Sequence, residues 1–431
     1  NTYAGFGNNT NNPSDNGTPT DISGTNTGEN TGAVPPKLRK VSSMPIAGFG
    51  IFTKERYKIV PVVPTPSTDT TSTGTNTEAS ASTNTDTSDT SKTATATPTP
   101  IPKVTDLKNT KNSAGTESVT AVRYVARATG NIYENFADIL NEQKFSSTII
   151  PQIYDAYFDS KAESVVMRYL KDDLKTIETF AGTLPKEVLG VDPDGTAELK
   201  GKFLPENVTD ISLSADLSKI FYLFNTSDST TGMTTNISGG NASQIFNSPF
   251  TEWLSMWPNA NMVTLTTKPT SGLPGYMYAI NPSKKDFTKI LSGINGLTTL
   301  TSPDGKNVLY SNNTLKLGIY NIDKQNVTPV ALQTMSEKCV WGKASDIIYC
   351  AVPKSIPQGS YPDSWYKGQV SFSDQIWKIN VKDGSTVLLV DPLTIVGGED
   401  IDGIKLALDK DQKYLFFINK KDSFLWEFNL N

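Results

Sequence analysis

The 431-residue sequence contains no histidine. Ser-His and Cys-His nucleophile pairs, histidine general bases and histidine-ligated metals all require the imidazole ring. Enzyme chemistry is therefore left to carboxylate, tyrosine, lysine or arginine side chains, and no sequence motif places two carboxylates in one pocket, as a glycoside hydrolase or lyase needs. From these absences we expect a protein that is not an enzyme and has neither a metal nor a cofactor.

Long apolar runs and an excess of positive charge are also lacking. No run of about 18 apolar residues occurs, so we expect no transmembrane segment. The chain has 39 basic and 44 acidic residues with a pI near 5.1. Such a balance provides no basic stripe for phosphates, so nucleic acid is not an expected partner. The first residue is Asn1, which fits a mature protein after signal-peptide removal but equally fits a truncated chain.

Cysteine occurs twice, at Cys339 and Cys350. If the segment between them is a hairpin that turns between Ala344 and Ser345, the two cysteines face each other on antiparallel strands. Cβ atoms at such positions are roughly 4.5–5.5 Å apart, which is close to disulfide reach. We expect a disulfide and hence an extracellular or cell-surface location. The alternative is a pair of small buried thiols in a reducing compartment, and two cysteines without histidine make an incomplete metal site.

Core-forming residues are scarce in two long segments. Residues 1–36 are rich in Asn, Thr, Gly and Ser, with Tyr3 and Phe6 among the few large apolar side chains, and residues 64–100 contain no Leu, Ile, Val, Met or aromatic residue. Such segments cannot bury enough apolar surface to offset chain entropy. We interpret 1–36 as a low-complexity N-terminal arm. Thr/Ser-rich tracts of this kind, and the Asn-X-Ser/Thr triplets of the chain, are also typical of glycosylation.

The rest of the chain repeats one pattern every forty-odd residues. Its clearest copy, TTLTSPDGKNVLYSNN at 298–313, places an apolar strand, a tight turn and a second apolar strand before a longer hairpin, LGIYNI and onward. Pro303 presets its own φ and Asp304-Gly305 favours the turn. Four short strands per repeat predict an all-β fold, a β-propeller over 37–431, with seven blades and with six or eight as alternatives.

The ends of the repeat array suggest how the ring closes. The seventh repeat stops after three strands, and 38–43 (LRKVSS) resembles the outer strands of other repeats. A ring must join its first and last blades to remove open edges, so we expect 38–43 to be the fourth strand of the last blade. We expect the Thr/Ser/Pro-rich segment 64–117 to be an insertion between the second and third strands of the first blade. The alternative is a linker between two domains.

The S-P-D-G-K turn followed by an apolar strand, Ser302 to Tyr310, resembles the repeats of TolB-type and WD-like bacterial propellers. Weaker copies lie at 214–224 and 408–418. Overall the chain resembles secreted or surface bacterial propeller proteins with Thr/Ser-rich tails. The resemblance implies a fold, together with binding to other proteins or a place in the cell envelope, and no assigned catalytic activity.

Three segments are candidate sites. An insertion at 355–374 carries Tyr361, Trp365 and Tyr366, which could stack on a sugar or grip a protein partner; the alternative is a loop that covers the sixth blade. The acidic segments 191–199 and 397–403 have the residue types of a calcium loop but not its full spacing, so we interpret them as turns or solvated loops.

Three functions remain open. The first is a non-catalytic extracellular structural protein that self-assembles into a filament or surface layer, with Tyr3 and Phe6 of the arm among its contacts. The second is a monomeric propeller that binds a protein or a glycan. The third and least favoured is a carboxylate glycosidase or lyase acting at the central face of the propeller.

Overall fold

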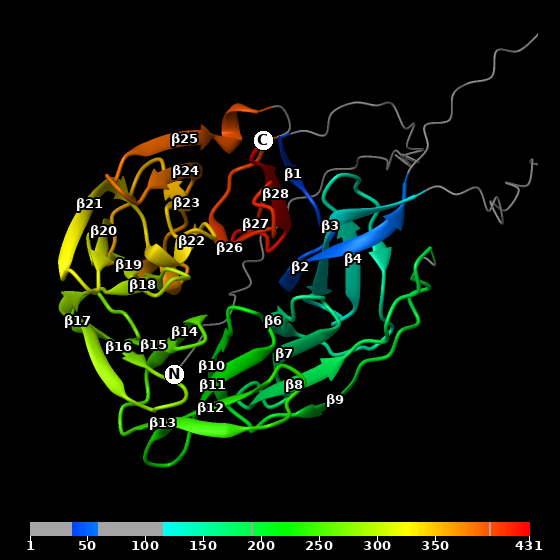
Figure 1. Ribbon diagram of the computed structural model, residues 1–431, viewed down its shortest axis with the longest axis horizontal. Coiled ribbons are helices and arrows are strands. Elements are labelled where there is room, and N and C mark those ends of the chain that lie inside the picture. Colours follow the sequence, from blue (N-terminus) through cyan, green and yellow to red (C-terminus); the bar gives the residue numbers. More distant parts are fainter. Residues whose placement is uncertain (1–36, 59–114, 191–192, 396–397) are drawn as a thin grey trace, which may run out of the picture. The chain divides into compact units, whose positions relative to one another are not determined.

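The computed structural model describes residues 37–58, 115–190, 193–395 and 398–431. Of the described residues, 37–55 and those from 118 onward belong to one compact unit, and 56–58 and 115–117 are grouped separately. In the first unit seven four-stranded antiparallel sheets surround a central axis, one after another along the sequence (Figure 1). The predicted seven-bladed β-propeller is confirmed. The arm 1–36, with Tyr3 and Phe6, lies outside the described residues.

Each blade runs from an innermost to an outermost strand in chain order. Blade 1 contains β2 (Ile46–Tyr57), β3 (Thr116–Ala126), β4 (Ile132–Phe136) and β5 (Gln143–Lys144). Blade 2 contains β6 (Ile153–Phe158), β7 (Ser164–Leu170), β8 (Ile177–Thr183) and β9 (Lys200–Phe203). Blade 3 contains β10 (Val208–Leu213), β11 (Lys219–Asn225), β12 (Thr230–Asn236) and β13 (Ser243–Ser248). Blade 4 contains β14 (Trp253–Asn259), β15 (Met262–Thr267), β16 (Pro274–Ile280) and β17 (Phe287–Asn295).

The same order continues to the C-terminus. Blade 5 contains β18 (Thr298–Thr301), β19 (Asn307–Ser311), β20 (Lys316–Asn321) and β21 (Asn326–Gln333). Blade 6 contains β22 (Cys339–Trp341), β23 (Ile347–Pro353), β24 (Asp374–Asn380) and β25 (Thr386–Val390). Blade 7 contains β26 (Gly403–Leu408), β27 (Tyr414–Asn419), β28 (Leu425–Asn429) and, from the start of the chain, β1 (Leu38–Lys40). The short helices are η1 (Ser336–Lys338), α1 (Asp363–Tyr366) and η2 (Pro392–Thr394).

The ring closes as the sequence predicted. β1 pairs antiparallel with β28, placing Arg39 opposite Glu427. Leu38 is buried and packs in the apolar cluster of blade 7 with Phe428. The guanidinium of Arg39 forms an ion pair with Glu427, Nη2 to Oε1 3.1 Å, with the two side chains 9% and 3% exposed. A strand from one end of the chain therefore removes the open edge that the last three strands would leave.

The long Thr/Ser/Pro-rich segment enters blade 1 one strand earlier than predicted. Residues 46–57 form a single long strand, β2, and the next strand of the same sheet is β3. The segment between them therefore separates the first and second strands of blade 1, not the second and third. The prediction required two strands of blade 1 before residue 64, whereas residues 46–57 form one continuous strand of 12 residues. Residues 59–114 lie outside the described part of the chain.

The turn chemistry of the best repeat appears as expected. Gly305 has φ of 73°, a left-handed conformation that glycine adopts without strain. The Asp304 carboxylate accepts hydrogen bonds from Ser302 Oγ at 2.5 Å and from Lys306 N at 3.0 Å. The turn thus joins β18 to β19 with its polar groups satisfied.

Apolar clusters between neighbouring sheets hold the blades together. Large aromatic side chains dominate several of them, and Trp257, Trp341 and Trp426 are each at most 6% exposed. Trp377 is half-buried and packs against the cluster between blades 5 and 6. These four tryptophans pack between neighbouring blades, where burial of such large rings contributes strongly to sheet-on-sheet packing.

The cysteine hairpin is also confirmed. Cys339 lies directly opposite Cys350 on β22 and β23, with Cα atoms 4.0 Å apart and the sulfurs bonded to each other. Ser345 takes the positive φ in the turn, 60°. Among the described residues no helix is long and apolar enough to cross a bilayer.

Candidate functional sites

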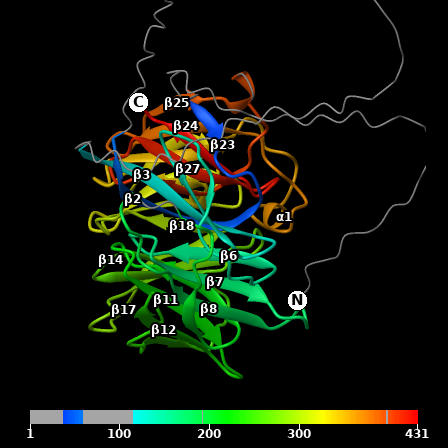
Figure 2. The ribbon, with the colours of Figure 1, turned by 90° about the vertical axis from the view of Figure 1, so that its right-hand side faces the viewer.

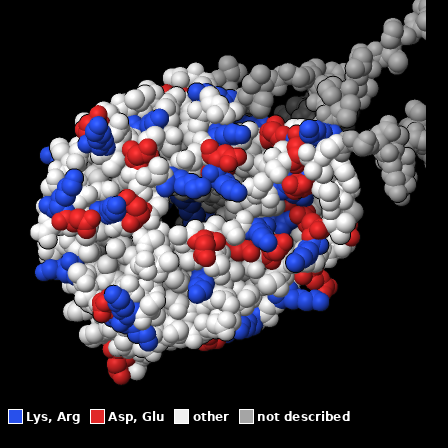
Figure 3. All heavy atoms as spheres, viewed as in Figure 1, with Lys and Arg blue, Asp and Glu red and all other residues white. Residues whose placement is uncertain are grey.

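A cluster of charged side chains lies at the axis of the propeller. Figure 3 shows a hollow near the middle of the ring whose edges carry both Lys/Arg and Asp/Glu. Lys405 on β26 of blade 7 reaches across to blade 2, where its ammonium pairs with Asp155, and it donates a hydrogen bond to Ala47 O of blade 1 at 3.2 Å. Arg168 on β7 donates to the other oxygen of Asp155 at 3.1 Å. One carboxylate therefore holds cations from two blades.

The backbone of β26 is distorted where it presents Lys405. The register of β26 on β27 shifts between Ile404 and Ala407, and Lys405 has φ of 52°. A bulge re-aims a side chain, and a left-handed non-glycine residue is strained by about 1 kcal/mol or more. This strained conformation directs the Lys405 ammonium toward the axis.

A second carboxylate, that of Asp210 on β10, lies near the Asp155–Lys405 pair but in a different environment. It accepts hydrogen bonds from Ser255 N and Ser255 Oγ, both at 2.6 Å. Burial raises the pKa of Asp210 despite these bonds. Burial would also raise the pKa of Asp155, but the charges of Lys405 and Arg168 lower it below its ordinary value. Two neighbouring carboxylates with pKa values pushed apart can act as acid and base.

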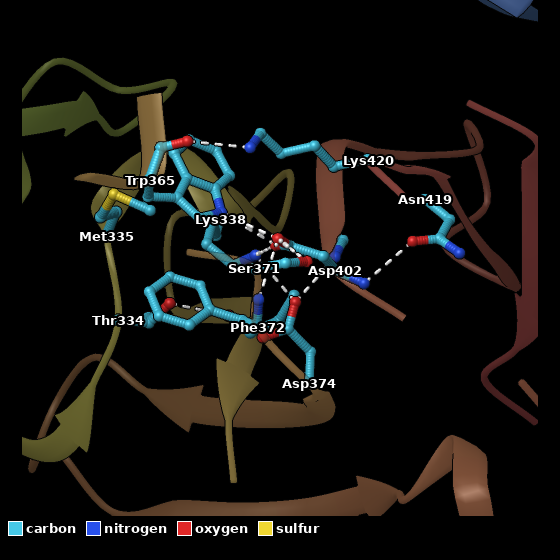
Figure 4. A network of polar contacts seen from close by, with 12 residues as sticks. Thr334, Met335, Lys338, Trp365, Ser371, Phe372, Asp374, Asp402, Asn419 and Lys420 are labelled. Carbon is cyan, nitrogen blue, oxygen red and sulfur yellow. Dashed lines mark hydrogen bonds and ion pairs between the residues drawn. The ribbon is translucent and has the colours of Figure 1, made fainter. Parts of the chain in front are cut away.

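A second ionic cluster is completely buried between blades 6 and 7 (Figure 4). The Lys338 ammonium lies 2.8 Å from Asp374 Oδ2 and also pairs with Asp402, and all three side chains have no exposed surface. Asp402 further accepts Trp365 Nε1 at 2.9 Å and Phe372 N at 3.1 Å. Burying such charges requires this degree of pairing, because each lost partner leaves an uncompensated charge.

The second cluster contains more negative than positive charge. Lys338 has two carboxylate partners, and burial raises the pKa of Asp374 to about 6 despite the attraction of Lys338. Next to it, burial raises the pKa of Glu337 and lowers the pKa of Lys420. Within the described residues no three Asp, Glu or Cys side chains are grouped to hold a metal ion. Through Asp402 the cluster contacts Trp365 and Phe372, which belong to the segment that covers it.

The cover is the aromatic insertion that the sequence singled out. Tyr361 and Trp365 are 4% and 5% exposed and pack with Phe372 and with Leu315 and Met335 of the neighbouring repeat. Residues of the insertion reach further, to blade 4. There Asp363 accepts Thr270 Oγ1 at 2.9 Å and Ser271 N at 2.6 Å. In Figure 2, α1 lies to one side of the strands of the ring.

The insertion therefore covers blade 5 and reaches blade 4, which is more than the expected cover for the sixth blade. Tyr366 is half-buried and donates to Glu337 Oε1 at 2.5 Å. The rings of Tyr361 and Trp365 present little surface to solvent. In the structure these side chains pack against neighbouring residues of the same chain. Their contact with a partner remains a prediction.

The acidic segment 397–403 is not a solvated loop throughout. Each of its carboxylates has a different lysine partner: Glu399 pairs with Lys40 at 2.8 Å, Asp400 with Lys421, and the buried Asp402 with Lys338. In the segment 191–199, Asp194 accepts bonds from Thr196 in an ordinary turn, as predicted. Asp192 lies outside the described residues.

An apolar groove of about 910 Å³ lies between blades 3 and 4 near the rim of the ring. Its floor consists of four aromatic rings, each of which contacts two of the others. Phe246 and Trp253 pack edge to face, and Tyr278 stacks on Phe287 with ring centroids 4.5 Å apart. Phe246 also contacts Phe287, and Trp253 contacts Tyr278. Strands β13, β14, β16 and β17 supply these rings. The volume is in the range of pockets that bind ligands.

The lining of the groove exposes large apolar side chains. Phe250 is 71% exposed, Leu273 65% and Phe287 49%. Five aromatic side chains among the described residues are more than a third exposed, and three of them, Phe250, Tyr276 and Phe287, line this groove. A patch of exposed apolar side chains of this kind is typical of an interaction site.

The charges of the groove have one sign. Its lining includes Lys268 and Lys285 and neither Asp nor Glu. Lys268 is paired with exposed Glu252 at 2.9 Å. Sequence reasoning missed the groove because its parts come from two repeats. The signal was the aromatic content of 246–253 and 276–287, which resembled ordinary blade packing.

No family model and no curated protein matches this chain. Among solved structures it is similar to an oligogalacturonate lyase in complex with manganese, with a TM-score of 0.48 and 10% identity over 72% of this chain and 85% of that chain. An oligogalacturonate lyase from Vibrio parahaemolyticus gives 0.45 and 10% over 72% and 86%. TolB from Acinetobacter baumannii gives 0.37 and 11% over 70% and 60%. The resemblance to TolB-type propellers is confirmed for the fold.

The expectation that the protein is not an enzyme is corrected by the same comparison. Oligogalacturonate lyases are enzymes built on a propeller. Lack of histidine was therefore too weak a ground for excluding catalysis, since the axial cluster brings together Asp155, Asp210 and Lys405 without any imidazole. The similarity itself concerns the fold and assigns no reaction to this chain.

Proposed function

We propose that this protein is an extracellular or cell-surface propeller that associates with further copies of itself, as in a filament or surface layer. The observation that carries the proposal is the aromatic groove between blades 3 and 4, where Phe250, Leu273 and Tyr276 face solvent together. Interfaces are distinguished by buried aromatic anchors seated in apolar pockets. A groove of this kind favours association with a polypeptide.

Two further features support the location and the type of partner. The Cys339–Cys350 disulfide is typical of proteins outside the cytoplasm. The Thr/Ser-rich segment and the Asn-X-Ser/Thr triplets are typical of chains that carry glycans at a surface. A monomeric propeller that binds a different protein or a glycan through the same groove is the alternative.

The test is the association state of the full chain. Sedimentation velocity should show an average mass that rises above the monomer as the concentration increases. The variant Phe250→Ser/Leu273→Ser removes two exposed side chains of the groove and should shift the midpoint of association at least tenfold to higher concentration. Val387→Ser, at a position 57% exposed on blade 6, is the matched control and should associate like the wild type. A wild-type protein that stays monomeric at every concentration contradicts self-association.

A further inference from the structure

We infer that the groove between blades 3 and 4 binds residues 1–7 of a second copy of this chain, with Tyr3 and Phe6 as the side chains that enter it. This inference rests on the proposed self-association and adds the segment and the surface that carry it. The sequence of the segment is NTYAGFG. Four aromatic rings form the floor of the groove, and aromatic side chains pack favourably on one another edge to face or offset.

The arm has the composition that such a groove selects. Tyr3 and Phe6 are the only aromatic residues among the first 36, and the residues between them are small. A segment with two rings three residues apart and little else can place both in one pocket. Small neighbours also reduce the bulk that must pass the exposed walls formed by Phe250 and Leu273.

The charges of the two surfaces are complementary. Residues 1–36 contain Asp15, Asp21 and Glu29 and no Lys or Arg, whereas the groove lining contains two lysines and no carboxylate. Opposite charges across a rim speed association and set its orientation. An arm of the same sign as the groove would be repelled.

The backbone at the groove offers a further contact. β13 is the outermost strand of blade 3 and pairs with β12 alone among the described strands. Its residues 245–248 line the groove. An extended peptide can add to such an edge by main-chain hydrogen bonds while its side chains enter neighbouring pockets.

The arm is long enough to reach a partner copy. The arm joins at β1, in blade 7, and the groove lies between blades 3 and 4, on the other side of the ring (Figure 1). An extended chain of 36 residues spans up to about 120 Å at about 3.3 Å per residue, so a neighbouring molecule is within reach. A contact of one copy's arm with another copy's groove is head-to-tail, and repeated it builds a chain or a ring.

The experiment uses two full-length variants that each lack one half of the contact. Tyr3→Ser/Phe6→Ser keeps the groove and loses the anchors, and Phe250→Ser/Leu273→Ser keeps the anchors and loses the groove. Each variant alone should be monomeric where the wild type associates. Mixed in equal amounts, they should form a dimer and nothing larger, because such a pair has one working arm and one working groove. Ile22→Ser in the arm is the matched control and should associate normally.

A labelled synthetic peptide of residues 1–30 provides the direct measurement. Its fluorescence anisotropy should rise on adding the Tyr3→Ser/Phe6→Ser protein. The affinity should fall at least tenfold when the protein also carries Phe250→Ser/Leu273→Ser, or when the peptide carries the two serines.

The possible failures are distinguishable. If the wild type associates and the Tyr3→Ser/Phe6→Ser variant associates equally well, the inference is overturned and the proposed self-association stands. If the wild type is monomeric and the peptide binds only the arm variant, the arm occupies the groove of its own molecule, which overturns docking on a second copy. A monomeric wild type whose arm variant binds no peptide overturns both.

Discussion

Asp374 is a buried carboxylate whose ionised form is disfavoured by its surroundings. Its carboxylate has no exposed surface and shares the Lys338 ammonium with Asp402. Burial raises the pKa of Asp374 from 3.8 to about 6 even with that cation beside it. Asp374 Oδ1 has no hydrogen-bond partner among the described residues. The residue anchors the insertion, and its ionisation costs stability.

Replacing Asp374 by asparagine should therefore change how stability depends on pH. The folded protein binds this proton more tightly than the unfolded chain, so ionisation of Asp374 reduces the free energy of unfolding as pH rises from about 4 to about 6. At about 1.4 kcal/mol per pKa unit, the reduction is about 3 kcal/mol. The free energy of unfolding of Asp374→Asn, relative to wild type, should increase by that amount between pH 4 and pH 7 in urea titrations.

Asp400→Asn is the control for this prediction. The pKa of Asp400 is lowered: burial opposes the shift, and the Lys421 partner and other contacts outweigh it. Its charge stabilises the folded state above the unfolded pKa, and this contribution is lost only as pH falls below about 4 toward the lowered folded pKa. The relative stability of Asp400→Asn should therefore change little between pH 4 and pH 7. Parallel curves for Asp374→Asn and wild type would show that the buried carboxyl has an ordinary pKa.

The closing strand is the element on which the ring depends. β1 contributes three residues to blade 7, and its central residue, Arg39, pairs with Glu427. Burial raises the pKa of Glu427 to about 7 although Arg39 opposes the shift. The strand therefore brings the cation that a buried carboxylate of the last blade requires.

Arg39→Ala should destabilise the protein in a pH-dependent manner. Above pH 7 the variant leaves a buried carboxylate without its cation, which costs about 3–5 kcal/mol. Near pH 5 Glu427 is protonated in the folded state, so the loss should be smaller. Chemical unfolding at pH 5 and pH 8 measures both values. The double variant Arg39→Met/Glu427→Gln should recover most of the loss at pH 8, and an equal loss at both pH values would refute the assignment.

At the scale of the whole molecule, contacts near the axis between non-adjacent blades add to those between adjacent blades. Neighbouring blades share apolar clusters, whereas Lys405 joins blade 7 to blade 2 and touches Ala47 of blade 1. A propeller held only by neighbour contacts can open between any two blades. The Lys405–Asp155 ion pair and the Lys405–Ala47 hydrogen bond link three consecutive blades near the point where the ring closes.

Lys405→Ala should loosen these blades selectively. The ammonium is partly exposed, so we expect a loss of only about 1 kcal/mol in the free energy of unfolding. Native-state hydrogen exchange should show faster exchange in β6 and β26 and unchanged exchange in β15 of blade 4. Lys410→Ala, an exposed lysine of the same blade, is the control. Faster exchange in every blade alike would mean that the pair stabilises the ring as a whole.

The sequence by itself determined the repeating architecture. A strand–turn–strand unit such as Ser302–Tyr310 has its turn residues and its alternating apolar positions within reach of one another, so local chemistry decides it. The same holds for the Cys339–Cys350 pair, which needed only the register of one hairpin, and for the closing strand, which followed from a blade that lacked one. The entry point of the long segment in blade 1 was missed because β2 is one strand of 12 residues, longer than the short strands of the other blades.

The candidate sites were decided by the tertiary structure. Lys405 and Asp155 are 250 residues apart, and only closure of the ring brings them together. The aromatic groove combines the end of one repeat with the middle of the next, and each ring, viewed within its own repeat, resembles packing. Local patterns specify strands and turns, because those depend on neighbours in sequence. Charge pairs and grooves depend on which faces meet in space, and that is settled by the order and closure of the blades.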